Sequence, residues 1–264
     1  MTDIFLVILK GYAILFVMQT ILWLIQCKTK DASTADVGWS IGMVVLVVWY
    51  ALHFDGGRIR EMLFLFPLTI WSCRLSFHLI SRMARTKEDS RYARFRESWG
   101  RQATKNFFLI YQLQPLLNVM LSVPFLIAFL NPSEHIHATE IVGLAFWIIG
   151  FSGEIIADQQ LKYFLSKPEN KGHVCREGLW GYSRHPNFFF EWVMWVAYFI
   201  MASASPYGLL GIIAPLVMLF LLIKVTGIPL MEANALKTKG KEFKEYMETT
   251  SMFIPFPKRK GILS

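Results

Sequence analysis

Long apolar segments set the strongest limit on how this chain can fold. Seven of them approach the roughly 20 residues that a helix needs to cross about 30 Å of hydrocarbon. They cover residues 4–26, 37–53, 62–80, 107–130, 141–161, 188–204 and 209–225. The pattern predicts an all-α integral membrane bundle of about seven transmembrane helices.

The composition agrees with a membrane location. Of the 264 residues, 54% are hydrophobic and 17% are charged, against roughly 45–50% and 25% in an average soluble domain. The 22 Phe, 9 Trp and 12 Met residues suit side chains that face lipid better than one water-covered core. The three cysteines lie far apart without CxxC or Cys/His spacing, so we expect neither a disulfide framework nor a metal site.

The Lys and Arg residues fall almost entirely on one side of the predicted bundle. If the seven spans alternate in direction, 22 of the 27 lie in the loops and tail of one side, and only Arg58 and Arg60 lie on the other. An excess of Lys and Arg marks cytoplasmic loops. We therefore expect the N-terminus outside and the C-terminus in the cytoplasm, and no nucleic-acid partner despite the net charge of +8.

Polar and ionisable side chains occur inside or at the ends of the predicted spans, where a charge costs roughly 2.5–3.5 kcal/mol or more. Several repeat at i, i+4 and so share one face of a helix. Structural ion pairs between helices would explain single pairs, but most of the set lies at predicted cytoplasmic ends. This placement favours a polar cavity, bordered by cytoplasmic loops, that could hold a cofactor. The set comprises Asp36, Arg74, His78, Glu154, Asp158, Lys162, Asn187, Glu191, Lys224 and Glu232.

The densest polar segment covers residues 178–191. Pro186 suits the first turn of a helix. Asn187 and Glu191 would then share one face at the start of the sixth span. Arg184 and His185 precede that helix N-terminus, where an anion can bind. The structural alternative is a helix started by Pro with an Arg that reaches toward water.

A basic cluster covers residues 82–105. Arg82 and Arg85 lie one helical turn apart where the third span ends. They would contact either the phosphate of a ligand or anionic lipid head groups, and the sequence leaves both possibilities open. The sequence has no GxGxxG, GxxxxGK[ST], HExxH or GxSxG motif, so a nucleotide cofactor would be held by helices and loops rather than by a Rossmann sheet.

Several stretches match motifs of known membrane enzymes. They are Gly-Leu-Trp-Gly-Tyr-Ser-Arg-His-Pro-Asn-Phe at 178–188, Glu-Ile-Ile-Ala-Asp-Gln at 154–159, and the downstream segments 224–232 and 251–256 with Tyr246. On these motifs the sequence resembles the steroid 5α-reductase family, specifically its bacterial-type branch named DUF1295. The RHPN-type motif also occurs in isoprenylcysteine and phospholipid methyltransferases.

The resemblance implies a single membrane domain, 1–264, in which helices of residues 136–264 bind NADPH and helices of residues 1–135 form the substrate side. It implies Asp158, Asn187 and Glu191 as cofactor ligands. The full set of candidate cofactor-binding residues is Arg74, Arg82, Arg85, Glu154, Asp158, Lys162, Tyr182, Arg184, His185, Asn187, Glu191, Lys224, Glu232 and Tyr246.

The substrate-activating acid of the family is not carried over intact. Steroid 5α-reductases place a Gln-Glu pair early in the second helix and a Tyr in the third, whereas this sequence has Ala35-Asp36 and Trp71 there. Asp36, Tyr111 or another phenol would then supply the acid, or the substrate differs. Steroid specificity is not supported.

The expected reaction is the NADPH-dependent reduction of a lipophilic, enone-like double bond, with the substrate entering from the bilayer. Two alternatives remain open. One is an S-adenosylmethionine-dependent membrane methyltransferase with Arg184, His185 and Glu232 at the cofactor. The other is a non-catalytic lipid-binding or assembly protein that kept the fold.

Overall fold

The structure is a computed structural model that describes residues 3–85, 88–225 and 227–257. In these ranges every regular element is a helix, apart from one isolated parallel bridge between Ser183 and Ser251. Five helices in this part of the chain are long and apolar enough to cross a membrane, and six if a bent pair is one span. The predicted fold class, an all-α multi-pass membrane bundle, is confirmed. Four of the Lys and Arg residues from which the orientation in the membrane was predicted lie outside the described residues: Lys87, Lys258, Arg259 and Lys260.

The chain divides into two compact units that interleave along the sequence. Unit 1 contains residues 1–141 and 198–214, and unit 2 contains residues 142–197 and 215–264. The predicted halves, 1–135 for substrate and 136–264 for cofactor, are assignments of function and remain a prediction.

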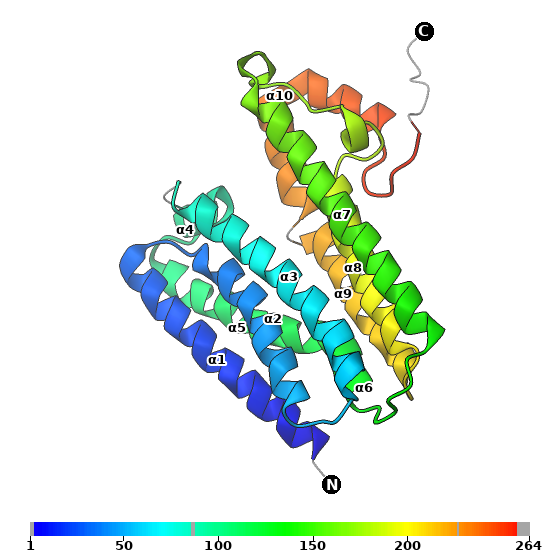
Figure 1. Cartoon of the computed structure of the whole chain (residues 1–264). Coiled ribbons are helices and arrows are strands. Elements are labelled where there is room, and N and C mark those ends of the chain that lie inside the picture. Colours follow the sequence, from blue (N-terminus) through cyan, green and yellow to red (C-terminus); the bar gives the residue numbers. More distant parts are fainter. Residues whose placement is uncertain (1–2, 86–87, 226, 258–264) are drawn as a thin grey trace. The chain divides into compact units, whose positions relative to one another are not determined.

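Unit 1 is a bundle around a central helix. α2 packs against α1, α3 and α5 (Figure 1). Its elements are α1 (Ile4–Thr29), α2 (Thr34–Ala51), α3 (Arg58–Met83), α4 (Ser90–Trp99), η1 (Gly100–Gln102), α5 (Ala103–Leu121), α6 (Val123–Phe129) and η4 (Gly208–Ile212).

Two glycines let the helices around α2 approach closely. A Cβ atom on Gly38 would lie 2.8 Å from the amide nitrogen of Gln19 in α1, and one on Gly42 would lie 2.7 Å from that of Asn118 in α5. The glycines therefore leave room for buried amide side chains. Small residues and interhelical hydrogen bonds hold helices together in membranes, where apolar contacts alone discriminate poorly.

The predicted span 107–130 is not one straight helix. It breaks at Ser122 into α5 and α6, which are bent by 44°. Pro124 lies in the first turn of α6, and because proline has no N–H and its ring crowds the preceding turn, it ends the α5 ladder there.

Unit 2 contains most of α7, which is long and apolar enough to cross a membrane, most of the 17-residue helix α8, and several further helical segments. Trp192 of α8 donates to the carbonyl of Pro215 in α9 (3.0 Å), so these helices are neighbours. The elements are α7 (Ala138–Ser166), η2 (Pro168–Asn170), η3 (Gly178–Gly181), α8 (Pro186–Ala202), α9 (Ile213–Phe220), the π-helical turn η5 (Leu221–Val225) and α10 (Ile228–Thr249). The first residues of α7 and α9 and the last residues of α8 belong to unit 1.

Two helices lie where the sequence predicted only basic loops. α4 has 10 residues and α10 has 22. α10 follows directly on the apolar run from Gly208 to Val225, but it carries four lysines and four glutamates. We therefore place α10 outside the membrane.

Candidate functional site

The start of α8 meets the C-terminal part of α7. Asn187, in the first turn of α8 after Pro186, donates from Nδ2 to Oδ1 of Asp158 in α7 (3.3 Å). Glu154 lies one turn before Asp158, and Glu191 lies one turn after Asn187. Since residues at i, i+4 share a helix face, the four side chains form one polar stretch along the two helices.

The η3 turn is fixed onto α7 by two hydrogen bonds. Trp180 donates from its indole nitrogen to the carbonyl of Ala157 (2.9 Å), and the backbone N–H of Leu179 donates to Oε1 of Gln160 (2.9 Å). Gly178 has φ +54, and a Cβ atom there would lie 2.4 Å from the Gln160 amide. Only glycine fits this position without strain, so the turn places residues 182–185 beside α7.

Arg184, His185 and Glu232 form a buried cluster. Arg184 Nε donates to Oε1 of Glu232 (2.7 Å), and His185 Nε2 lies 3.2 Å from the same oxygen. The Arg184 and His185 residues are 8% and 5% exposed. Burial raises the pKa of Glu232, but the hydrogen bonds from His185 and Arg184 outweigh it and hold that pKa below its usual 4.5. Glu232 is therefore an ionised partner that orients both residues.

The segment after α10 wraps back over residues 182–185. The N–H of Arg184 donates to the Ser251 carbonyl (2.8 Å), and Ser183 Oγ donates to the Phe253 carbonyl (2.7 Å). The Tyr246 hydroxyl bonds to the carbonyls of Trp180 and Ser183. Tyr246 thus fixes η3 to α10.

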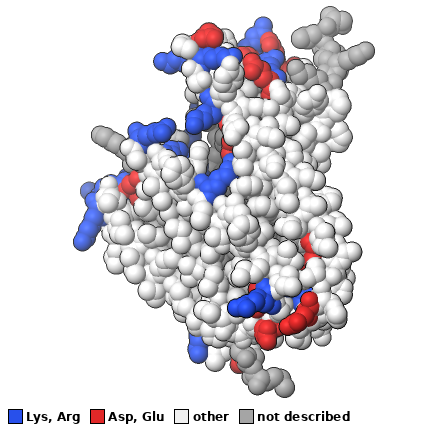
Figure 2. Space-filling view, in the orientation of Figure 1, with Lys and Arg blue, Asp and Glu red and all other residues white. Residues whose placement is uncertain are grey.

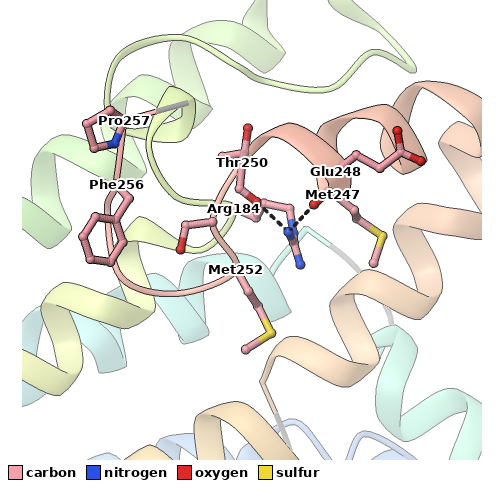
Figure 3. A pocket seen from close by; sticks show the side chains of 8 residues that line it. Arg184, Met247, Glu248, Thr250, Met252, Phe256 and Pro257 are labelled. Atoms are coloured by element: carbon pink, nitrogen blue, oxygen red, sulfur yellow. Dashed lines mark hydrogen bonds between the residues drawn. The ribbon is translucent and has the colours of Figure 1, made fainter. Parts of the chain in front are cut away.

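A cavity lies beside this wrapped segment. Arg184 borders it and donates from Nη1 to the carbonyls of Met247 (3.1 Å) and Thr250 (2.7 Å), as the dashed lines in Figure 3 show. The remaining lining residues are Glu248, Ser251, Met252, Phe256 and Pro257. Most of the hydrogen-bonding capacity of Arg184 is used to hold the chain around it.

Three predicted site residues of unit 2 reach the surface. Lys162 lies one turn after Asp158, Lys224 lies in the π-helical turn η5, and the Tyr182 residue is 50% exposed. Among the described residues, none of the three side chains makes a hydrogen bond or an ion pair with an acidic group. Because they are exposed, all three side chains are available to a ligand. Lys224 also lies in a π-helical turn, a feature that occurs frequently at functional sites.

The two predicted catalytic residues lie in unit 1 and are both engaged. Asp36 accepts a hydrogen bond from Arg91 at Oδ2 and from the Tyr92 hydroxyl at Oδ1, each at 2.7 Å. The buried Tyr111 has its hydroxyl 2.6 Å from Oγ1 of Thr34. Sequence reasoning did not single out Arg91 or Tyr92 as partners of Asp36, because only the packing of α4 brings them there.

The predicted site residues divide between the units. Arg82 pairs with Asp89 (2.6 Å), whereas Arg85 is exposed and Arg74 lies on α3. Unit 1 contains Asp36, Arg74, Arg82, Arg85 and Tyr111. Unit 2 contains Glu154, Asp158, Lys162, Tyr182, Arg184, His185, Asn187, Glu191, Lys224, Glu232 and Tyr246.

Comparison with known proteins identifies a family. Residues 22–250 match the family described as "Protein of unknown function (DUF1295)". An uncharacterized protein of Schizosaccharomyces pombe is 26% identical over 228 residues, and the match covers 76% of this chain and 66% of the yeast protein. The chain thus spans just under two thirds of the length of this relative. No solved structure matches. The chain belongs to the DUF1295 family of proteins of unknown function.

Proposed function

We propose that the protein is a membrane-embedded reductase that uses NADPH to reduce a lipophilic, conjugated carbon–carbon double bond. The observation that carries the proposal is the contact between Asn187 and Asp158 where α8 begins. An amide and a carboxylate held together offer both donors and acceptors, as the carboxamide and the hydroxyl groups of a nicotinamide nucleotide require. The motif resemblance to steroid 5α-reductases supports the same assignment.

The other charges of unit 2 fit a phosphorylated cofactor. Lys162 and Lys224 are exposed cations that can pair with phosphate oxygens. Arg184 and His185 face Glu232 instead, so we assign them the role of positioning the loop that precedes α8. NADPH, when bound, supplies a hydride to the substrate, and the residues of this chain bind and orient it.

The hydrogen bonds of unit 1 bear on the proton donor. Each carboxylate oxygen of Asp36 already accepts a hydrogen bond, one from Arg91 and one from Tyr92. Both oxygens of this carboxyl group are thus occupied by side chains of the protein itself. We therefore propose a phenol, Tyr111 or Tyr92, as the acid, with Asp36 as the residue that holds the Tyr92 hydroxyl.

Cofactor binding by the purified full chain tests the proposal. We expect NADPH to raise the melting temperature, since a ligand at 100 times its Kd stabilises the folded state by about 2.7 kcal/mol. Asp158→Ala and Asn187→Ala should abolish that increase, while the exposed neighbour Gln159→Ala should keep it. An unchanged melting temperature in wild type, or an increase that survives both variants, would contradict the proposal.

One observation favours a second candidate, a methyltransferase that uses S-adenosylmethionine. The three residues expected at its cofactor, Arg184, His185 and Glu232, form one cluster. The same assay separates the two candidates, because stabilisation by S-adenosylmethionine but not by NADPH would support the methyltransferase.

We further propose that the N-terminus lies outside and the C-terminus lies in the cytoplasm. The distribution of Lys and Arg between alternate loops supports this orientation. The lipophilic substrate would then enter from the bilayer and the cofactor from the cytoplasm.

A further inference from the structure

The end of unit 1 formed by α4 contains a first group of arginines that are paired inward. Arg82 pairs with Asp89 (2.6 Å), and Arg91 pairs with Asp36 (2.7 Å). A third pair joins Arg96 and Glu88 (2.7 Å). Since each of these guanidinium groups has a carboxylate partner, their charges are largely neutralised within the protein.

A second group of cations at the same end points outward. Each member is exposed, and none makes an ion pair in the part of the chain that the structure describes. Asp31 and Glu97 are the acidic residues of this end that lack an ion pair there. We call this second group the basic collar, and it consists of Lys28, Lys30, Arg85, Arg94, Arg101 and Lys105. Figure 2 shows blue side chains at this end of unit 1, above a largely uncharged surface.

The packing of α4 separates the two groups. Phe95 stacks on Trp99 (5.1 Å between ring centroids), and Trp99 contacts Phe107 of α5 edge to face (5.2 Å). The aromatic face of this short helix thus packs against α5. Arg94 of α4 and Arg101 of the following η1 turn remain exposed. An aromatic face on one side and exposed cations on the other are typical of an amphipathic helix at a membrane surface.

Exposed apolar side chains lie next to the basic collar. The side chains of Leu24 and Leu109, 51% and 59% exposed, lie about one turn from Lys28 and Lys105. In a membrane-spanning bundle such exposed leucines face acyl chains. Trp23, which donates to the Thr104 carbonyl (3.1 Å), is a residue type enriched at the boundary between lipid and water. These exposed apolar side chains beside the cations favour a lipid partner over a nucleic acid.

We infer that the basic collar binds the head groups of anionic phospholipids. The charge is complementary, because the six cations, none of which is ion-paired within the described part of the chain, would meet the negative surface potential of anionic lipids. The inference does not depend on the proposed reductase activity, because no residue of the collar lies in unit 2. Arg85 thereby becomes a lipid contact, while Arg82 serves the internal network.

Lipid retention by the full chain tests the inference. Detergent-purified protein would be incubated with equal amounts of phosphatidylglycerol and phosphatidylcholine, and bound lipid would be counted by native mass spectrometry. We expect preferential retention of phosphatidylglycerol that weakens with salt. The double variant Arg94→Gln and Arg101→Gln should reduce the affinity for phosphatidylglycerol roughly 25-fold, since each surface cation contributes about fivefold.

A matched variant separates lipid recognition from a general effect of charge. Lys10→Gln combined with Arg58→Gln removes the same number of exposed cations from positions outside the collar and should leave phosphatidylglycerol retention unchanged. Equal retention of the two lipids by wild type would overturn the inference. So would an equal loss in both double variants, or an unchanged preference after the collar substitutions. Melting temperatures of both variants should match wild type, because none of the four side chains has an ion pair among the described residues.

Discussion

Arg60 is a buried cation at the end of unit 1 opposite α4. Its Nε donates to Glu140 (2.6 Å), and both residues are at most 1% exposed. Its two terminal nitrogens donate to the backbone carbonyls of Gly56, Asn131, Ser133 and His135. The sequence predicts Arg60 as a loop cation of the outer side, whereas in the structure it joins the start of α3 to residues 131–140, which are 71 to 80 positions away in the sequence.

Replacing Arg60 by Met should destabilise the protein strongly. The Glu140 carboxylate and four carbonyl groups would lose their partner, and breaking a buried ion pair in this way costs about 3–5 kcal/mol. Thermal unfolding in detergent would measure the loss. The exposed neighbour Arg58→Gln should change the free energy of unfolding by less than about 0.5 kcal/mol, and Arg60→Met with Glu140→Leu should recover part of the loss.

Glu232 should make stability depend on pH. Because Arg184 and His185 hold its folded-state pKa below 4.5, its stabilising effect is complete above that pH and disappears as the pH falls through the lowered pKa. The melting temperature of wild type should therefore exceed that of Glu232→Gln at pH 7, and the two should converge at acidic pH, as the pH falls through the lowered pKa. The exposed Glu248→Gln should follow wild type throughout; a constant difference for Glu232→Gln would contradict the assignment.

At the scale of elements, the segment after α10 is held by a few hydrogen bonds. Ser183 is fully buried, and its hydroxyl donates to the Phe253 carbonyl and accepts the N–H of His185 (3.1 Å). Ser183→Ala should cost about 1–3 kcal/mol and accelerate hydrogen exchange at Phe256, whose N–H donates to the Tyr182 carbonyl.

Hydrogen exchange followed by mass spectrometry would localise that change. Ser166→Ala is the matched control, since the Ser166 hydroxyl bonds within its own helix to the Tyr163 carbonyl (2.7 Å). Equal exchange of residues 250–257 in wild type and Ser183→Ala would show that the hydroxyl does not hold the segment.

The membrane helices could be predicted from the sequence because each depends on a local run of apolar residues. α4 and α10 could not, because their stability comes from tertiary contacts such as Phe107 beneath α4. The bend at Ser122 had a local cause in Pro124, but an apolar run of 24 residues hid it. Runs of apolar residues thus identify the helices that cross the membrane and miss those that tertiary packing stabilises.

The contents of the candidate site were predicted more completely than its contacts. The i, i+4 spacing predicted shared faces for Asn187 and for Asp158, and the structure brings these two side chains together. The engagement of Asp36 by Arg91 and Tyr92 depends on segments about 55 residues apart, which no local pattern encodes. The assigned roles remain predictions.

For the whole molecule, the orientation predicts which loops are accessible from outside. In a chain without its three cysteines, Glu134→Cys lies in the loop before α7 and Lys241→Cys lies in α10. An impermeant maleimide added to intact cells should label position 134 and not position 241. Permeabilised cells should show labelling of both, and the opposite pattern in intact cells would refute the proposed orientation.

The interleaving of the two units has a consequence for synthesis. A ribosome makes residues 142–197 of unit 2 before it makes residues 198–214, which complete unit 1. The hydrogen bond between Asn131 and Ser205 can therefore form only after residues 142–197 have been made. The ion pair between Arg60 and Glu140 can form before then. Domains made in sequence normally fold from the N-terminus onward. Here unit 1 cannot be completed until the ribosome has made residues 142–197 of unit 2 and then residues 198–214.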